Sequence, residues 1–206
     1  MKKIIISIIC VLALITSCHS DLDVDHKSGL TKGNMWKTME DAVSARNGMY
    51  RQLRSALSTS HIFWGEYRTG LWGAGNDGSE GYRDEIYSNK IPASNGLTNW
   101  GALYTTISDA NFILKYTPGL SAHNEDEKNA VLADAYFVRA YCYYMIARIL
   151  GDAPVLLAPY ESAKQDNLFP SRDGVDKVFA QVESDIDEAL KIIPETWHIA
   201  DRNMAT

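Results

Sequence analysis

The sequence predicts a mostly α-helical protein with long irregular loops. Four segments repeat their apolar residues at the three- and four-residue spacing of a helix, and three of them end at a proline or a glycine. No stretch of any length shows the alternation of apolar and polar residues that is typical of a strand. With 206 residues, 46% of them hydrophobic, the chain can bury a sizeable core. We therefore predict an all-α fold.

Residues 1–17 have the pattern of a bacterial lipoprotein signal peptide. Two lysines precede the apolar run IIISIICVLALIT, which has the length of a signal-peptide core and is too short for a comfortable membrane span. The small residues Thr16 and Ser17 come directly before Cys18, as in a lipobox that is cleaved before a lipidated cysteine. We therefore expect Cys18 to carry a lipid anchor. The alternative is a soluble secreted protein that is cut nearby, with Cys18 as a chance thiol.

Residues 18–37 predict a flexible tether, since HSDLDVDHKSGLTKGN is polar and poor in large apolar residues. Its three alternating aspartates begin like an EF-hand calcium loop. However, His26 stands where that loop needs a glycine, and Lys32 stands where it needs a glutamate. Solvated acidic residues are the better interpretation.

The cysteines and the net charge exclude several classes of protein. Cys10 leaves with the signal peptide and Cys18 takes the lipid, so Cys142 is the one thiol that remains. No intramolecular disulfide can then form, and stability must come from packing. The net charge of −6 disfavours binding to nucleic acid or to an anionic lipid surface.

The first two helices are predicted over residues 38–57 and 100–116. Thr38, with Asp41 three residues later, resembles a capping box, and the apolar residues that follow fall on one face. The second helix has a similar apolar face, and the pair Pro118-Gly119 ends it.

The third helix is the longest and should pack against two neighbours. Asn124 caps its start, and apolar residues form a continuous stripe from Val131 to Ile149 with a second strip beside it. Charged residues inside this run exclude a membrane span. Gly151 and Pro154 end the helix.

A fourth helix is predicted over residues 173–193 and ends at Pro194. A short polar turn joins the second helix to the third, and both contain small residues. This arrangement suggests antiparallel hairpins of the kind found in tetratricopeptide proteins, although no second copy of the pattern recurs at a fixed period of about 34 residues.

Several phrases in order resemble the SusD/RagB family. WGALYTTISDAN is similar to one helix of that family, and ADAYFVRAYCYYMIARILGDAPVLL is similar to another with its G-D-x-P ending. SRDGVDKVFAQVESDIDEALKIIP resembles the helix that follows. The residues that carry the family pattern are Trp100, Tyr104, Asn111, Arg139, Gly151, Asp152 and Pro154. We expect them to pack and to bridge helices, with Arg139 in a structural ion pair or a carbonyl contact.

The resemblance implies an outer-membrane lipoprotein of Bacteroidota that covers a SusC-like TonB-dependent transporter at the cell surface. Such a protein captures glycan or peptide nutrients and hands them inward, without catalysis or a cofactor. Family members run to several hundred residues, so we expect residues 38–206 to be a truncated amino-terminal helical domain. A periplasm-facing helical-repeat lipoprotein with a protein partner is the alternative.

The long loop between the first two helices is the candidate ligand site, because loops of this length usually carry function. Aromatic rings can pack on the apolar faces of a sugar, while amides, carboxylates and arginine can bind its hydroxyl groups. The candidate residues are Trp64, Tyr67, Trp72, Asn76, Asp77, Tyr82 and Arg83. Trp64 and Trp72 are explained equally well by packing in a satellite core.

Other chemistries find little support in the sequence. GAGNDG, from Gly73 to Gly78, matches a dinucleotide-binding pattern but follows no strand and opens no helix. The five histidines are scattered without the spacing of a zinc site. Glu80, Asp84 and Glu85 could serve as the acid and base of a glycosidase, although acidic loop residues are usually solvated. We predict no metal site and no enzymatic activity.

Overall fold

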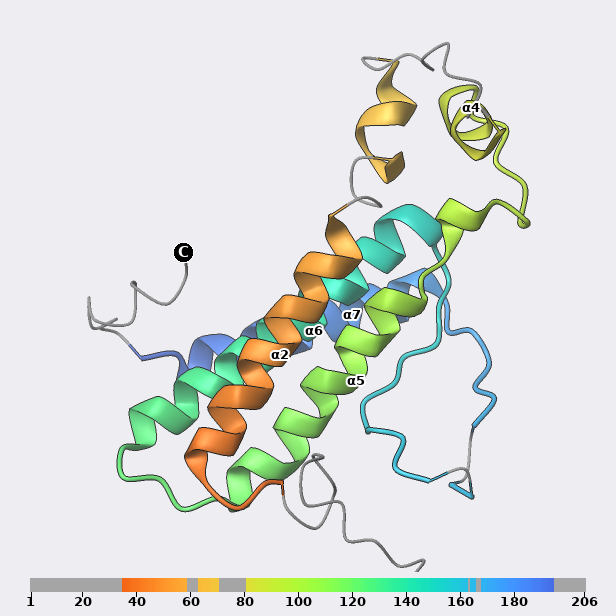
Figure 1. Cartoon of the computed structure of the whole chain (residues 1–206). Helices are drawn as coiled ribbons and strands as arrows, with labels where there is room; N and C mark the ends of the chain where they lie inside the picture. Colours follow the sequence, from red (N-terminus) through yellow and green to blue (C-terminus); the bar gives the residue numbers. More distant parts are fainter. Residues whose placement is uncertain (1–34, 59–62, 71–80, 163, 166–167, 195–206) are drawn as a thin grey trace, which may run out of the picture. The chain divides into compact units, whose positions relative to one another are not determined.

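The computed structural model describes residues 35–58, 63–70, 81–162, 164–165 and 168–194. From Trp36 onward these residues belong to one compact unit. Figure 1 shows its four long helices, which are α2 (Met39–Leu57), α5 (Gly101–Tyr116), α6 (Glu125–Leu150) and α7 (Val175–Ile192). The short ones are η1 (Glu66–Thr69), α4 (Gly81–Tyr87), η2 (Gly96–Thr98) and η3 (Thr117–Gly119). The described residues contain no strand, so the all-α prediction is confirmed.

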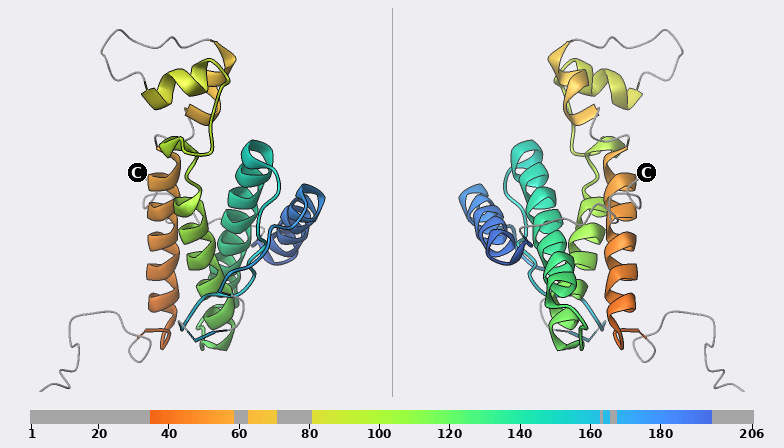
Figure 2. Two further views of the ribbon diagram at one scale, coloured as in Figure 1. Left: turned by 90° about the vertical axis from the view of Figure 1, so that its right-hand side faces the viewer. Right: turned by 90° about the vertical axis from the view of Figure 1, so that its left-hand side faces the viewer.

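The helix α6 is the centre of the packing. It contacts α2, α5 and α7, and Figure 2 shows the long helices side by side in the order α2, α5, α6, α7. Val131, Val138, Cys142 and Tyr143 of α6 are completely buried, which confirms the prediction that this helix packs on more than one side. No helix within the described ranges is long and apolar enough to cross a membrane. A tetratricopeptide-like register of these helices stays a prediction.

Both predicted helix starts with a capping side chain are confirmed. At α2, the carboxylate oxygen Oδ2 of Asp41 accepts the backbone N–H groups of Lys37 (2.8 Å) and Thr38 (3.0 Å). These hydrogen bonds to the charged form lower the pKa of the Asp41 carboxyl. At α6, Oδ1 of Asn124 accepts the N–H of Asp126 at 2.9 Å.

Trp36 falls within the range predicted as tether, yet its side chain packs against a helix. Its ring stacks on Tyr116 at the end of α5, with 5.3 Å between the ring centroids. Tyr116 in turn stacks on Phe112, one turn earlier. The packed part of the chain therefore already includes Trp36.

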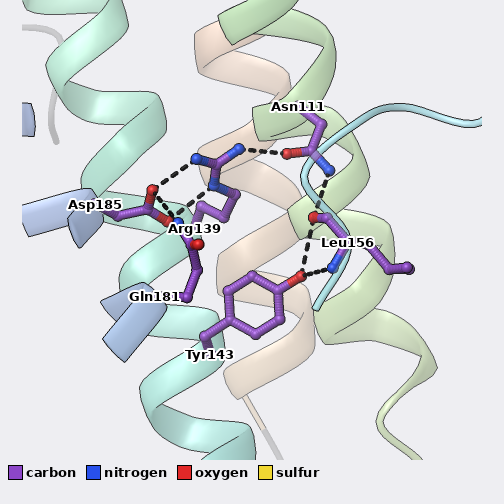
Figure 3. A network of polar contacts seen from close by, with 6 residues as sticks. All are labelled: Asn111, Arg139, Tyr143, Leu156, Gln181 and Asp185. Carbon is purple, nitrogen blue, oxygen red and sulfur yellow. Dashed lines mark hydrogen bonds and ion pairs between the residues drawn. The ribbon is translucent and has the colours of Figure 1, made fainter. Parts of the chain in front are cut away.

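A buried polar cluster joins three of the long helices (Figure 3). Arg139 of α6 donates from Nε and Nη2 to the two carboxylate oxygens of Asp185 on α7, at 2.8 and 2.6 Å. It also donates from Nη1 to Oδ1 of Asn111 on α5, at 2.7 Å. Arg139 is 6% exposed and Asp185 is 1% exposed, so the pair is almost completely shielded from water. Gln181, one turn before Asp185, donates to the same carboxylate at 2.9 Å.

The cluster extends to the strap, by which we mean residues 151–162 between α6 and α7. The backbone carbonyl of Leu156 accepts hydrogen bonds from Nδ2 of Asn111 and from the hydroxyl of Tyr143, both at 2.9 Å. The N–H of Leu156 donates back to the Tyr143 hydroxyl at 2.6 Å. We call these contacts and those of Arg139 the Arg139 network. The Arg139 network holds the strap against the helices through the main-chain groups of Leu156.

The fourth helix begins two residues later than predicted. Asp173 pairs with Ala153 of the strap in an isolated antiparallel bridge, and its side chain accepts the N–H of Val155 at 3.0 Å. Asp152 accepts the N–H of Val175, the first residue of α7, at 2.9 Å. Asp173 is engaged in the bridge and Gly174 is extended as the N-cap, so the helix begins at Val175.

Asn111→Ala should lower the free energy of unfolding by about 1 to 3 kcal/mol, because it leaves a guanidinium donor and the Leu156 carbonyl without this partner. Urea denaturation measures the loss. Ser108→Ala, half-buried on the same helix, is the control and should stay within about 0.5 kcal/mol of the parent chain. Equal effects of the two changes would contradict the bridging role of Asn111.

Gly151→Ala should destabilise the chain by about 1 to 3 kcal/mol, because Gly151 has φ 79°, a conformation that strains any side chain. The matched control is Gly48→Ala in α2, where an added methyl group meets no atom within 4 Å. That change should stabilise by about 0.5 to 1 kcal/mol through helix propensity. The two glycines therefore give opposite signs in the same urea titration, and two changes of the same sign would overturn this account of Gly151.

Candidate functional site

A pocket of about 570 Å³ lies where the connection between α2 and α5 meets the carboxyl end of α6. That volume is within the range of small-ligand sites. Residues of the connection, of α6 and of the segment before α7 line it together. Its walls include Phe63, Trp64, Ile86, Trp100, Ile149 and Arg172.

Two tryptophans form fixed parts of the wall. Trp64 is 7% exposed, and its indole N–H donates to the carbonyl of Leu97 at 2.6 Å, so that N–H is not available to a ligand. Trp100 is half-buried at the start of α5, with the ring of Tyr104 edge-on at 5.7 Å. The guanidinium of Arg172 lies over the Trp100 ring, 5.0 Å from its centroid.

Asn95 organises the loop that carries these walls. Its side chain donates to the carbonyl of Tyr82 (2.9 Å) and to Oε2 of Glu85 (2.8 Å), and it accepts the N–H of Leu97 (2.9 Å). Asn95 is only 3% exposed. It therefore ties α4 to η2 and holds Leu97, the partner of Trp64, in place.

The structure brings only some of the predicted ligand-binding residues together. Trp64 lines the pocket. Tyr67 packs against Phe63 with 4.7 Å between the ring centroids, and the guanidinium of Arg83 lies over the same Phe63 ring at 5.6 Å. Tyr82 is 56% exposed and is not part of the pocket wall.

The remaining predictions for this part of the chain cannot be placed. Trp72, Asn76, Asp77 and Glu80 lie outside the described residues, as does the glycine-rich stretch 73–78. The signal peptide, Cys18 and residues 18–34 of the tether also lie outside them.

Several pocket residues are missing from the sequence-based candidates. Phe63 and Ile86 have no distinctive pattern, and Ile149 falls in a helical stripe that reads as core. The sequence predicts a packing role for Trp100, and in the structure this residue also lines the pocket. Arg172 stands just before a helix in a family phrase, and only the fold brings it over Trp100, 72 positions earlier in the sequence.

The residues of the family phrases serve to join elements. The hydroxyl of Tyr104 donates to the carbonyl of Pro154 at 2.7 Å, and burial raises the pKa of this phenol. Asn111 and Arg139 belong to the Arg139 network. Gly151 ends α6 and Asp152 caps α7.

The acidic residues considered for glycosidase chemistry have different environments. Glu85 is engaged by the buried amide of Asn95, whereas Asp84 is exposed in the first turn of α4. Within the described ranges, no group of three or more His, Cys, Asp or Glu side chains is placed to hold a metal ion.

The chain is thus a helical scaffold with a pocket at the carboxyl end of its central helix. A family profile described as "Starch-binding associating with outer membrane" matches residues 37–204. The chain therefore belongs to the SusD-like family, as the resemblance predicts.

Relatives by sequence agree with this assignment, and solved structures share the fold. Two SusD-like proteins of Formosa agariphila are 29% and 30% identical to this chain and cover 87% and 95% of it. The chain spans only 35% and 39% of their lengths. NanU of B. fragilis matches with a TM-score of 0.70 and 22% identity, covering 86% of this chain and 35% of that one. A "Laminarin binding SusD-like protein" matches with a TM-score of 0.67 and 18% identity, covering 81% and 36%.

Asn95→Ala should lower the free energy of unfolding by about 1 to 3 kcal/mol, because it removes three partly buried hydrogen bonds at once. Hydrogen exchange should show faster exchange of the Leu97 amide, whose acceptor is lost. Ser94 precedes Asn95 and is exposed. Its change to alanine is the control and should leave the exchange rate of the Leu97 amide unchanged. Unaltered protection of Leu97 in the Asn95 variant would refute this role.

Proposed function

We propose that this chain is part of a lipid-anchored, surface-exposed protein that captures glycan or peptide nutrients for a SusC-like TonB-dependent transporter of the outer membrane. The family description supports an association with starch and with the outer membrane. A structural neighbour described as laminarin-binding supports a glycan as the ligand. The lipobox ending at Cys18 supports the anchor.

The observation that carries the binding function is the 570 Å³ pocket with Trp64 and Trp100 in its walls. Aromatic rings offer a large apolar surface of fixed orientation, which suits the C–H faces of sugar rings. The walls stand on helix ends and on a loop held by a buried asparagine, so little ordering is required when a ligand binds. Such a rigid site suits capture and release.

The proposal predicts that Trp100→Ala weakens glycan binding at least about tenfold, because removal of a stacking wall costs on the order of 1.4 kcal/mol or more. Isothermal titration of the full chain with laminarin and starch oligosaccharides measures this. Phe169→Ala removes an aromatic ring that is 96% exposed and lies outside the pocket, and it should leave affinity unchanged. Equal affinities of the two variants would contradict this use of the pocket.

The partner and the location need a separate experiment. The lipidated chain should copurify with a large outer-membrane barrel from cells grown on the inducing nutrient, and protease added to intact cells should digest it. A chain that is protected from protease and that lacks a barrel partner would instead support a periplasm-facing interaction protein.

A further inference from the structure

We propose that the pocket binds an acidic saccharide, and that Arg172 and Arg68 bind its carboxylate or sulfate group. This inference rests on the proposed glycan-binding function and specifies its ligand class. Within the described residues, the pocket wall contains these two arginines and no acidic residue. The chain as a whole has a net charge of −6. The charge of the pocket wall is therefore opposite in sign to that of the whole chain.

Arg172 is held in a position from which it can bind an anion. The central carbon of its guanidinium lies over the ring of Trp100, 5.0 Å from the ring centroid. None of the ion pairs among the described residues includes Arg172. A guanidinium that contacts a ring through its face keeps the N–H groups at its edge, and these can bind a carboxylate or sulfate.

Nearby acidic residues do not neutralise Arg172. The carboxylate of Asp173 accepts the N–H of Val155 and the ammonium group of Lys177, at 3.0 and 2.6 Å. The carboxylate of Asp152 accepts the N–H of Val175. The carboxylates of both aspartates are therefore already hydrogen-bonded to the strap or to the first turn of α7.

Arg68 is the second cation of the wall. Its side-chain contact within the described ranges is a long one, from Nε to Oδ1 of Asn89 at 3.4 Å, and this contact leaves the terminal nitrogens for a ligand. A second pocket of about 540 Å³ shares Trp64, Arg68 and Ile149 with the first and adds Arg148 and one acid, Glu66. Positive charge therefore continues from one pocket into the next, as a multiply charged oligosaccharide would require.

The aromatic and cationic groups have complementary tasks. The half-buried Trp100 can pack against the ring carbons of a sugar, while the guanidinium edges bind the acid group that the ring carries. A neutral sugar would leave both arginines without their anion. The site should therefore select for charge, and the selection should weaken as salt screens it.

The test compares binding of trigalacturonate, trimannuronate and a sulfated chondroitin disaccharide with their methyl-esterified or desulfated forms, using the full chain. At least one acidic probe should bind about tenfold or more tightly than its neutral form, and added sodium chloride should reduce the difference. Arg172→Gln should weaken that probe about tenfold, and Arg172→Lys less, since lysine keeps the charge without the planar edge. Arg51→Gln, exposed on α2 and outside both pockets, should change nothing.

Three outcomes would overturn the proposal. Neutral forms that bind as tightly as acidic ones would remove the role of charge, as would an Arg172→Gln, Arg68→Gln double variant with unchanged affinity. Binding of laminarin or starch with no binding of any acidic probe would refute the acidic ligand and leave the proposed function standing. Absence of binding to any glycan, acidic or neutral, would contradict the proposed function itself.

Discussion

Arg139 and Asp185 face each other between α6 and α7, where almost no water reaches either of them. Burial of a charge costs several kcal/mol unless an opposite charge and further hydrogen bonds compensate for it. Asn111 supplies the third contact of the guanidinium, and Gln181 supplies another contact of the carboxylate. The pair therefore requires α5, α6 and α7 to meet in one arrangement, and any shift of these helices would leave a buried charge without a partner.

The same network controls the pocket through the strap. Asn111 and Tyr143 hold Leu156, and Tyr104 holds Pro154, so the strap cannot move away from α5. Its bridge to Asp173 then fixes the segment that carries Arg172 over Trp100. One wall of the candidate ligand site thus depends on a cluster of polar side chains in the helix core.

The sequence predicted the helices well because apolar spacing and end signals are local. Thr38 with Asp41, Asn124, and Gly151 each act on residues within one or two turns. The partner of Arg139 could not be chosen from the sequence, since Asp185 lies 46 positions away and several acids share that helix. The pocket was missed for the same reason: Phe63, Ile149 and Arg172 are brought together only by packing. The loop candidates Tyr67 and Arg83 were selected for their chemistry, and in the structure both lie against Phe63.

A double-mutant cycle between Arg139 and Asp185 tests most directly whether the buried pair determines the arrangement of the helices. Arg139→Met, Asp185→Leu and the double variant are each unfolded with urea, and the free energies are compared with that of the parent chain. Each single change should cost about 3 to 5 kcal/mol, because it leaves the other charge buried alone. The double variant should be less destabilised than the sum by about 2 to 3 kcal/mol. Additive effects, within about 0.5 kcal/mol, would contradict the account.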